Sequence, residues 1–84
     1  MGKITVCFDP FLAHLTEQNT IEFPVKGEIS VTELEQLLKD AFPALLSVNL
    51  NYVYYLVAGQ VLTGKDAAVH EGEQVTLVQP LYGG

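Results

Sequence analysis

The sequence ends in Gly83-Gly84, and this pair is the strongest candidate for chemistry in the chain. Two residues without a Cβ can pass through a channel too narrow for any side chain, and their backbone reaches conformations that other residues avoid. A terminal Gly84 also leaves the α-carboxylate as the only reactive group at the tip. The alternative is a frayed or tag-derived end, because termini are often disordered and glycine is common. The rest of the chain has to decide between these two interpretations.

The remaining reactive side chains are weaker candidates. Cys7 is the only cysteine and has no His or Lys beside it, so we predict a buried structural thiol rather than a nucleophile. His14 and His70 are far apart and lack the spacing of metal ligands, so no metal site is predicted. No cofactor is expected on the chain itself.

Composition places the chain among small globular domains. Its 84 residues suffice for one domain, and 49% apolar with 17% charged residues excludes intrinsic disorder. No apolar run reaches the ~18 residues of a membrane span, and the N-terminus has no signal-peptide core. A lone Cys7 forms no internal disulfide, and nothing points to secretion. The cytoplasm is therefore the expected location.

The charge is negative, with ten acidic residues against four lysines and a net charge of −6. Such a surface repels phosphate backbones, which argues against a nucleic-acid partner. We therefore expect Tyr52, Tyr54 and Tyr55 to pack in the core and sheet rather than stack on bases. A basic protein partner is favoured, and the alternative is that the charge serves only solubility.

The first half of the chain predicts two strands and one helix. Alternating apolar residues mark strands at 4–8 and 21–25, and Pro24 argues for an edge position in the second. Asp9-Pro10 ends the first strand, and residues 11–15 are expected to form a covered loop or one helical turn. 

Ser30 and Glu33 then predict a capping box at the start of a helix that Phe42-Pro43 ends. Glu33, Glu35 and Asp40 are expected on its solvated face, with Glu35 and Lys39 paired.

The second half predicts strands separated by turns. Residues 52–57 are apolar or aromatic throughout, which is typical of a strand buried on both faces. A turn at 58–60, a short strand at 61–62, a loop at 63–68, a turn at 70–73 and a final strand at 75–79 follow. A hairpin followed by a crossover helix places the next strand parallel to one already present. The fold class is α+β, with the helix on one face of a mixed sheet and an apolar docking surface on the other.

The C-terminal segment carries a resemblance to a known family. The acid-Gly-acid turn at 71–73, the strand after it, Pro80 in the linker and the terminal Gly-Gly resemble the C-terminal signature of the MoaD/ThiS sulfur carriers. The likeness also includes the strand at 4–8, the helix that begins after Ser30 and the hairpin at 56–61. It implies a ubiquitin-like β-grasp domain over residues 1–79, with four to five strands on one main helix. Residues 80–84 would be an extended flexible tail.

Two positions depart from the pattern. Ala58 stands where family hairpins commonly carry Asn, and Ala adopts the positive φ of such turns only at a cost. Molybdopterin-type members often have two consecutive prolines in the linker, and Gln79-Pro80 provides one. The single Pro80 still resembles the molybdopterin branch more than the thiamin branch.

The resemblance implies a carrier rather than an enzyme, acting as the small subunit of molybdopterin synthase. A ubiquitin-activating-like enzyme would adenylate Gly84 with ATP, and a persulfide donor would convert it to a thiocarboxylate. Gly83 would let the tail enter the active site, and the large synthase subunit would receive the sulfur. Partner contacts are expected at Val78, Pro80, Leu81 and Tyr82, which would form the apolar centre of an interface. Acidic residues would surround this centre.

Alternatives stay open for the function. The sulfur acceptor can be the thiazole of thiamin or another pathway, and the pterin cofactor can hold molybdenum or tungsten. A protein modifier would instead join Gly84 to lysines of targets. A β-grasp interaction module would transfer nothing.

Overall fold

The computed structural model describes residues 2–47, 53–64 and 66–79 of the chain. In chain order its elements are β1 (Lys3–Phe8), α1 (Pro10–Thr16), β2 (Thr20–Pro24), β3 (Glu28–Ser30), α2 (Val31–Ala41), the 3₁₀ helix η1 (Pro43–Ser47), β4 (Tyr54–Val57), β5 (Gln60–Val61), β6 (Ala68–His70) and β7 (Gln74–Val78).

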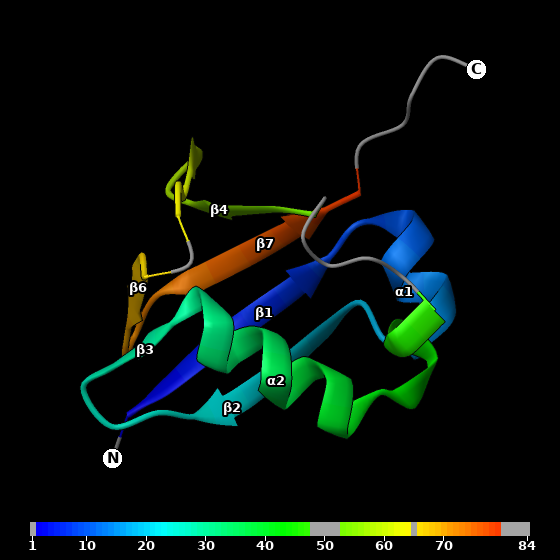
Figure 1. Ribbon diagram of the computed structural model, residues 1–84, viewed down its shortest axis with the longest axis horizontal. Coiled ribbons are helices and arrows are strands. Elements are labelled where there is room, and N and C mark those ends of the chain that lie inside the picture. The colour runs from blue at the N-terminus through cyan, green and yellow to red at the C-terminus, as the bar shows by residue number, and fades with distance from the viewer. Residues whose placement is uncertain (1, 48–52, 65, 80–84) are drawn as a thin grey trace.

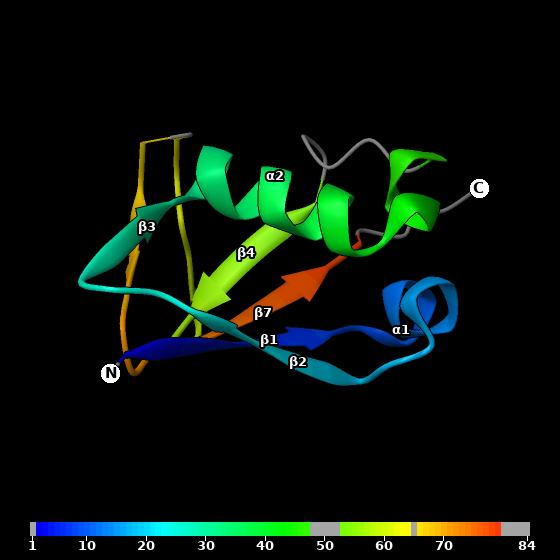
Figure 2. The ribbon, with the colours of Figure 1, turned by 90° about the horizontal axis from the view of Figure 1, so that it is seen from below.

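One mixed sheet organises the described part of the chain, with strand order β2-β1-β7-β4-β5. β1 and β7 pair in parallel at its centre, and the other neighbours pair antiparallel. Helix α2 crosses one face of this sheet, as the two views show (Figure 1, Figure 2). Helix α1 lies beyond the end of β1 (Figure 1). The predicted α+β class, with a mixed sheet on one main helix, is confirmed.

The hydrogen-bonded parallel pair of the sheet does not include the strand that follows α2. The strand after α2 is β4, and it pairs antiparallel with β7 and with β5. The final strand β7 inserts between β1 and β4, and it is β7 that runs parallel to β1. The strand after α2 therefore runs in the direction of β2, as predicted, but the hydrogen-bonded parallel pair forms between β1 and the later strand β7.

The core lies between α2 and the sheet. Alternate residues of β1, Ile4 and Val6, are fully buried, as are Leu34 and Leu38 of α2 and Leu77 of β7. This alternation is what a strand with one covered face requires. Pro24 ends β2 at the edge of the sheet, where its missing N–H costs no ladder hydrogen bond, as predicted.

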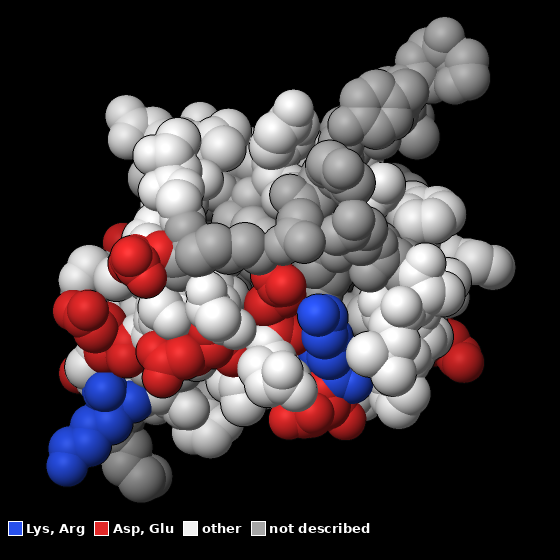
Figure 3. Space-filling view, in the orientation of Figure 1, with Lys and Arg blue, Asp and Glu red and all other residues white. Residues whose placement is uncertain are grey.

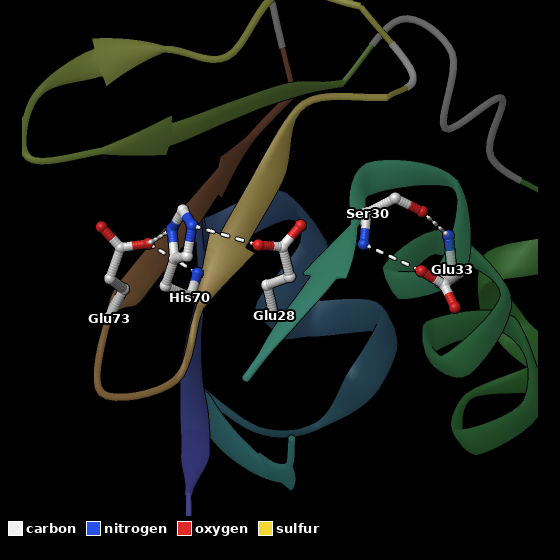
Figure 4. Close-up of polar contacts among 5 residues, drawn as sticks. All are labelled: Glu28, Ser30, Glu33, His70 and Glu73. Atoms are coloured by element: carbon white, nitrogen blue, oxygen red, sulfur yellow. Dashed lines mark hydrogen bonds and ion pairs between the residues drawn. The ribbon is translucent and has the colours of Figure 1, made fainter. Parts of the chain in front are cut away.

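The start of α2 confirms the predicted capping box. Ser30 Oγ accepts from the Glu33 N–H and Glu33 Oε1 accepts from the Ser30 N–H, both at 3.1 Å (Figure 4). The backbone and side-chain hydrogen bonds with Ser30 lower the pKa of Glu33. The helix ends at Ala41, and Phe42 forms its C-cap before Pro43, as expected.

Two segments are more helical than the sequence indicated. Residues 10–16 form the seven-residue α1 instead of a loop or single turn, because Asp9 caps it and Pro10 opens it. The η1 turn places Leu45 fully in the core.

The second half corrects two predictions. β4 is not buried on both faces, since Tyr55 is 5% exposed and its neighbour Tyr54 is 50% exposed. Residues 68–70, where the predicted loop at 63–68 meets the predicted turn at 70–73, form β6 and pair antiparallel with β3. Tyr52 lies outside the described residues.

The β4–β5 hairpin adopts the turn that Ala58 disfavours. Ala58 has φ 53° and Gly59 has φ 79°, and the flanking Val57 and Gln60 are paired. Two positive φ values in a two-residue loop are those of a type I′ turn, whose twist matches the strands. Pairing of β4 with β5 therefore outweighs the local preference of Ala58.

Candidate functional site

The structure describes only the first of the residues predicted to act at the C-terminus. Val78 is the last residue of β7 and is half-buried, and Gln79 follows it. Pro80, Leu81, Tyr82, Gly83 and Gly84 lie outside the described residues, as does the predicted tail as a whole. The site is therefore built from the surface that leads to residue 80.

An apolar strip occupies the face of the sheet away from α2. Val78 pairs with Tyr54 across β7 and β4, and Leu56 pairs with Val61 across β4 and β5. Paired residues point to the same face, so Val78, Tyr54, Leu56 and Val61 form one surface, called here the open-face strip. Tyr54 is 50% and Val61 48% exposed. The strip begins beside the last described residues of the chain.

The rest of this face is more polar. Lys3 and Glu22 form an exposed ion pair of 2.9 Å across β1 and β2. Cys7 lies in the row between Thr20 and Thr76 and is half-buried rather than buried, which corrects the predicted core thiol. The β strand alternation that buries Val6 turns Cys7 to the open face.

Acidic residues lie on both sides of the sheet. Glu22 pairs with Lys3 on the open face, and Glu73 lines a hollow together with Leu56 of the open-face strip. Figure 3 shows that red side chains gather on the face that α2 covers. Glu33 and Asp40 are exposed there, but Glu35 is only 9% exposed, which corrects its predicted place on the solvated face. The predicted pair of Glu35 with Lys39 is present at 3.7 Å.

The His70 turn is a solvated ion cluster at the opposite end of the sheet. The His70 ring lies between Glu28 Oε1 at 3.4 Å and Glu73 Oε1 at 3.3 Å (Figure 4). The His70 backbone N–H donates to Glu73 Oε1 at 2.7 Å and holds the pKa of Glu73 below its ordinary value. Within the described ranges, no three His, Cys, Asp or Glu side chains are placed to hold a metal ion. His14 lies apart, on α1.

Two surface hollows also lie at that end. One of about 520 Å³ is lined by residues around the β4–β5 turn and the start of β7, including Ala58 and Gln74. One of about 570 Å³ lies beside Gly2 and Glu71. The first is also lined by Leu56 and Thr76, so it adjoins the open-face strip, whereas the second lies at the other end of β7 from Val78. No helix in the described part of the chain is long and apolar enough to cross a membrane.

Asp9 is a residue whose part in this site the sequence did not indicate. Its Oδ1 accepts from the Leu12 N–H at 2.8 Å and caps α1. Its Oδ2 accepts from the Gln79 N–H at 2.5 Å. Its own N–H donates to the Leu77 carbonyl at 3.0 Å, and its carbonyl accepts from the Ala13 N–H at 2.8 Å. Asp9 therefore joins β1, α1 and the root of the C-terminal segment. The Asp-Pro pair could have indicated the cap.

Comparison with known proteins shows the fold. No protein-family model matches the sequence, and a search of curated protein sequences finds no significant match. Solved structures do match. The crystal structure of SAMP1 from Haloferax volcanii aligns with a TM-score of 0.81 and 23% identity, over 99% of this chain and 100% of that chain.

Two further structures concern molybdopterin proteins. A protein from Pyrococcus furiosus assigned as molybdopterin converting factor subunit 1 aligns with a TM-score of 0.79 and 16% identity, covering 96% of this chain and all of its own. The complex of subunits 1 and 2 of the molybdopterin-converting factor from Helicobacter pylori provides a match with a TM-score of 0.67 and 16% identity, over 98% and 99% of the two chains. The chain has the β-grasp fold of these proteins, which the resemblance to MoaD/ThiS proteins implies.

Proposed function

We propose that the chain is a sulfur carrier whose C-terminal Gly84 is adenylated and then converted to a thiocarboxylate, which supplies sulfur for molybdopterin synthesis. The observation that carries the proposal is the position of β7. This strand is central in the sheet, and its end at Val78 lies beside an exposed apolar strip just before the Pro-Leu-Tyr-Gly-Gly sequence. The match to molybdopterin converting factor subunit 1 over nearly the whole chain supports the same assignment.

The chemistry requires nothing from the carrier beyond its terminal carboxylate. Attack of that carboxylate on the α-phosphate of ATP releases pyrophosphate and gives an acyl-adenylate. A donor persulfide then displaces AMP and forms an acyl disulfide, and a thiol reductant cleaves its S–S bond to leave the thiocarboxylate. The adenylating enzyme, the persulfide donor and the large synthase subunit are the proposed partners. Gly83 serves to admit the tail to their active sites.

The open-face strip supplies the docking surface in this proposal. A small soluble domain seldom exposes contiguous apolar side chains without a partner for them. Tyr54, Leu56 and Val61 contribute such a surface, and Val78 links it to residues 80–84. Docking on the strip would place Pro80, Leu81 and Tyr82 against the partner, so that the terminus reaches inside it. The five residues after Gln79 span at most about 17 Å when extended.

Reconstitution tests the proposal. The chain is incubated with the adenylating enzyme of its native host, ATP and a persulfide donor, and the terminus is examined by mass spectrometry. We expect Gly84 to gain sulfur in place of one oxygen. A variant lacking Gly84 should fail completely yet melt at the wild-type temperature, because a terminal glycine has no side chain to contribute to a core. A wild-type terminus that remains unchanged contradicts the proposal.

A second candidate function is a protein modifier, favoured by the match to SAMP1, a protein that a second structure names small archaeal modifier protein 1. In this case a lysine amine would attack the carbonyl carbon of the Gly84 acyl-adenylate, forming an isopeptide bond and releasing AMP. The sequence offers a convenient assay, since cleavage after Tyr82 leaves only Gly-Gly on the modified lysine. Such remnants on host proteins, absent from a strain lacking the gene, support the modifier. Their absence together with a thiocarboxylate supports the carrier alone.

A further inference from the structure

The Asp9 side chain completes a hydrogen-bond ladder that the backbone of β1 leaves unfinished. β1 and β7 are in register from Thr5 with Gln74 to Phe8 with Leu77, and the Asp9 N–H still donates to Leu77. In a regular parallel pair, the Asp9 carbonyl would accept next from the Gln79 N–H. That carbonyl is turned into α1 instead, and the carboxylate accepts the Gln79 N–H in its place.

This contact is the last in which a backbone N–H of the C-terminal segment can donate before residue 81. Pro80 has no N–H, so the next position cannot donate a backbone hydrogen bond. The bond is charge-assisted, which makes it stronger than the neutral bond that it replaces. The Gln79 side chain adds no hydrogen bond of its own, because its Oε1 is buried without a partner in the part of the chain that the structure describes. The carboxylate of Asp9 thus fixes the backbone at Gln79.

We propose that Asp9 is a positioning residue for the transfer chemistry: its carboxylate fixes the direction in which residues 80–84 leave the sheet. The proposal rests on the proposed function, since only a reactive terminus needs a defined exit. A docked domain presents its tail as a tethered reactant, and orientation at the tether determines how often the terminus reaches the active site. Residues 80–84 begin one position after the fixed amide.

The alternative is that Asp9 acts only as the N-cap of α1. The two roles use different oxygens, so one substitution separates them. In Asp9→Ser a single hydroxyl retains a favoured cap for the Leu12 N–H, and no second oxygen remains for Gln79. Ser30→Ala is the matched control, because it removes the cap of α2 and touches neither Asp9 nor Gln79.

The first measurement uses the free protein and does not depend on the proposed function. Hydrogen exchange by NMR should show a protected Gln79 amide in the wild type, with protection lower by about tenfold or more in Asp9→Ser. Ser30→Ala should leave that amide protected. A wild-type Gln79 amide that exchanges as in an unstructured peptide overturns the contact, and so does full protection in a folded Asp9→Ser variant.

The second measurement follows adenylation by the host's ubiquitin-activating-like enzyme, with ATP–pyrophosphate exchange as the readout. Asp9→Ser should lower kcat about three- to tenfold and leave KM unchanged, because docking is intact and only tail orientation is lost. Ser30→Ala should change neither value. An unchanged kcat in Asp9→Ser overturns the positioning role. Failure of the wild type to be adenylated contradicts the proposed function itself, and the exchange data still decide whether the contact exists.

Discussion

The two faces of the main sheet are built from alternate residues of the same strands, yet only one of them is covered. Tyr55 points toward α2 and is 5% exposed, whereas Tyr54, the residue before it, is 50% exposed on the open face. Both faces carry large apolar side chains near the end of β7. On the covered face, burial against α2 accounts for them.

The difference shows which part of the sequence serves folding and which part needs another explanation. Leu34, Leu38 and Leu77 have no exposed surface, so the burial of their side chains stabilises the folded state. Tyr54 and Val61 remain about half exposed, so much of their apolar surface gains nothing from folding. In the proposed function, a partner that covers the open-face strip would bury this remaining surface.

The largest expected effect is a difference in the free energy of unfolding between variants on the covered face and variants on the open face. Leu38→Ala should lower the free energy of unfolding by about 2–5 kcal/mol, because it opens a cavity in the core. Leu56→Ala, on the open face, should cost less than about 1 kcal/mol. Chemical denaturation measures both values. Equal losses would mean that the open face is part of the core.

The second effect concerns binding. Tyr54→Ala should weaken binding to the host's adenylating enzyme about tenfold or more, since exposed aromatic residues at interface centres dominate affinity. Leu46→Ala is the control, because Leu46 is 67% exposed on η1, outside the strip. Calorimetric titration with each variant, at unchanged melting temperature, gives the comparison. If the Leu46 variant lost binding and the Tyr54 variant kept it, the docking surface would include η1 and not the open-face strip.

The third effect uses pH. Burial raises the pKa of Tyr55 above its ordinary value of 10, and the Glu35 carboxylate raises it further. The folded protein favours the neutral phenol over the phenolate. The resulting contribution to folding stability is fully present below about pH 10 and is lost as the pH rises above that value. Tyr55→Phe should therefore resist alkaline unfolding, and Tyr54→Phe should behave as the wild type.

The same substitution has a small effect at neutral pH. The Tyr55 hydroxyl is buried with no partner among the residues described, so Tyr55→Phe should be neutral or stabilise by about 1 kcal/mol. Thermal unfolding between pH 7 and 11 measures both effects. A Phe variant as alkali-sensitive as the wild type would contradict them.

The smallest effect is the ion pair on the open face. Lys3 and Glu22 are 2.9 Å apart, but their side chains are 60% and 55% exposed. A double-mutant cycle with Lys3→Met and Glu22→Gln should give a coupling of less than about 1 kcal/mol that declines with added salt. A large, salt-independent coupling would mean that this polar half of the face is structurally important.

The elements that follow local signals were predictable from the sequence. The capping box needs only Ser30 and Glu33, three residues apart, and the edge position of β2 follows from Pro24 alone. The alternation in residues 4–8 predicted β1 in the same way. These signals are short-range, so no knowledge of the partner segments is required.

The remaining features depend on distant segments. β6 is three residues long and exists because it pairs with β3, some forty positions away. The positive φ of Ala58 is imposed by the pairing of β4 with β5. Asp9 was correctly predicted to end its strand, but its second oxygen contacts Gln79, 70 residues later. Nothing near Asp9 in the sequence indicates that contact.

Mass spectrometry of the terminus of the chain from its native host tests the sulfur-carrier proposal most directly. Cleavage after Lys65 releases residues 66–84, which contain neither Met nor Cys, so oxidation of Met1 or Cys7 cannot imitate the change. The predicted result is a fragment in which sulfur replaces one oxygen at Gly84. A fragment that always ends in an ordinary carboxylate, even after incubation with the adenylating enzyme, ATP and a persulfide donor, would contradict the proposal.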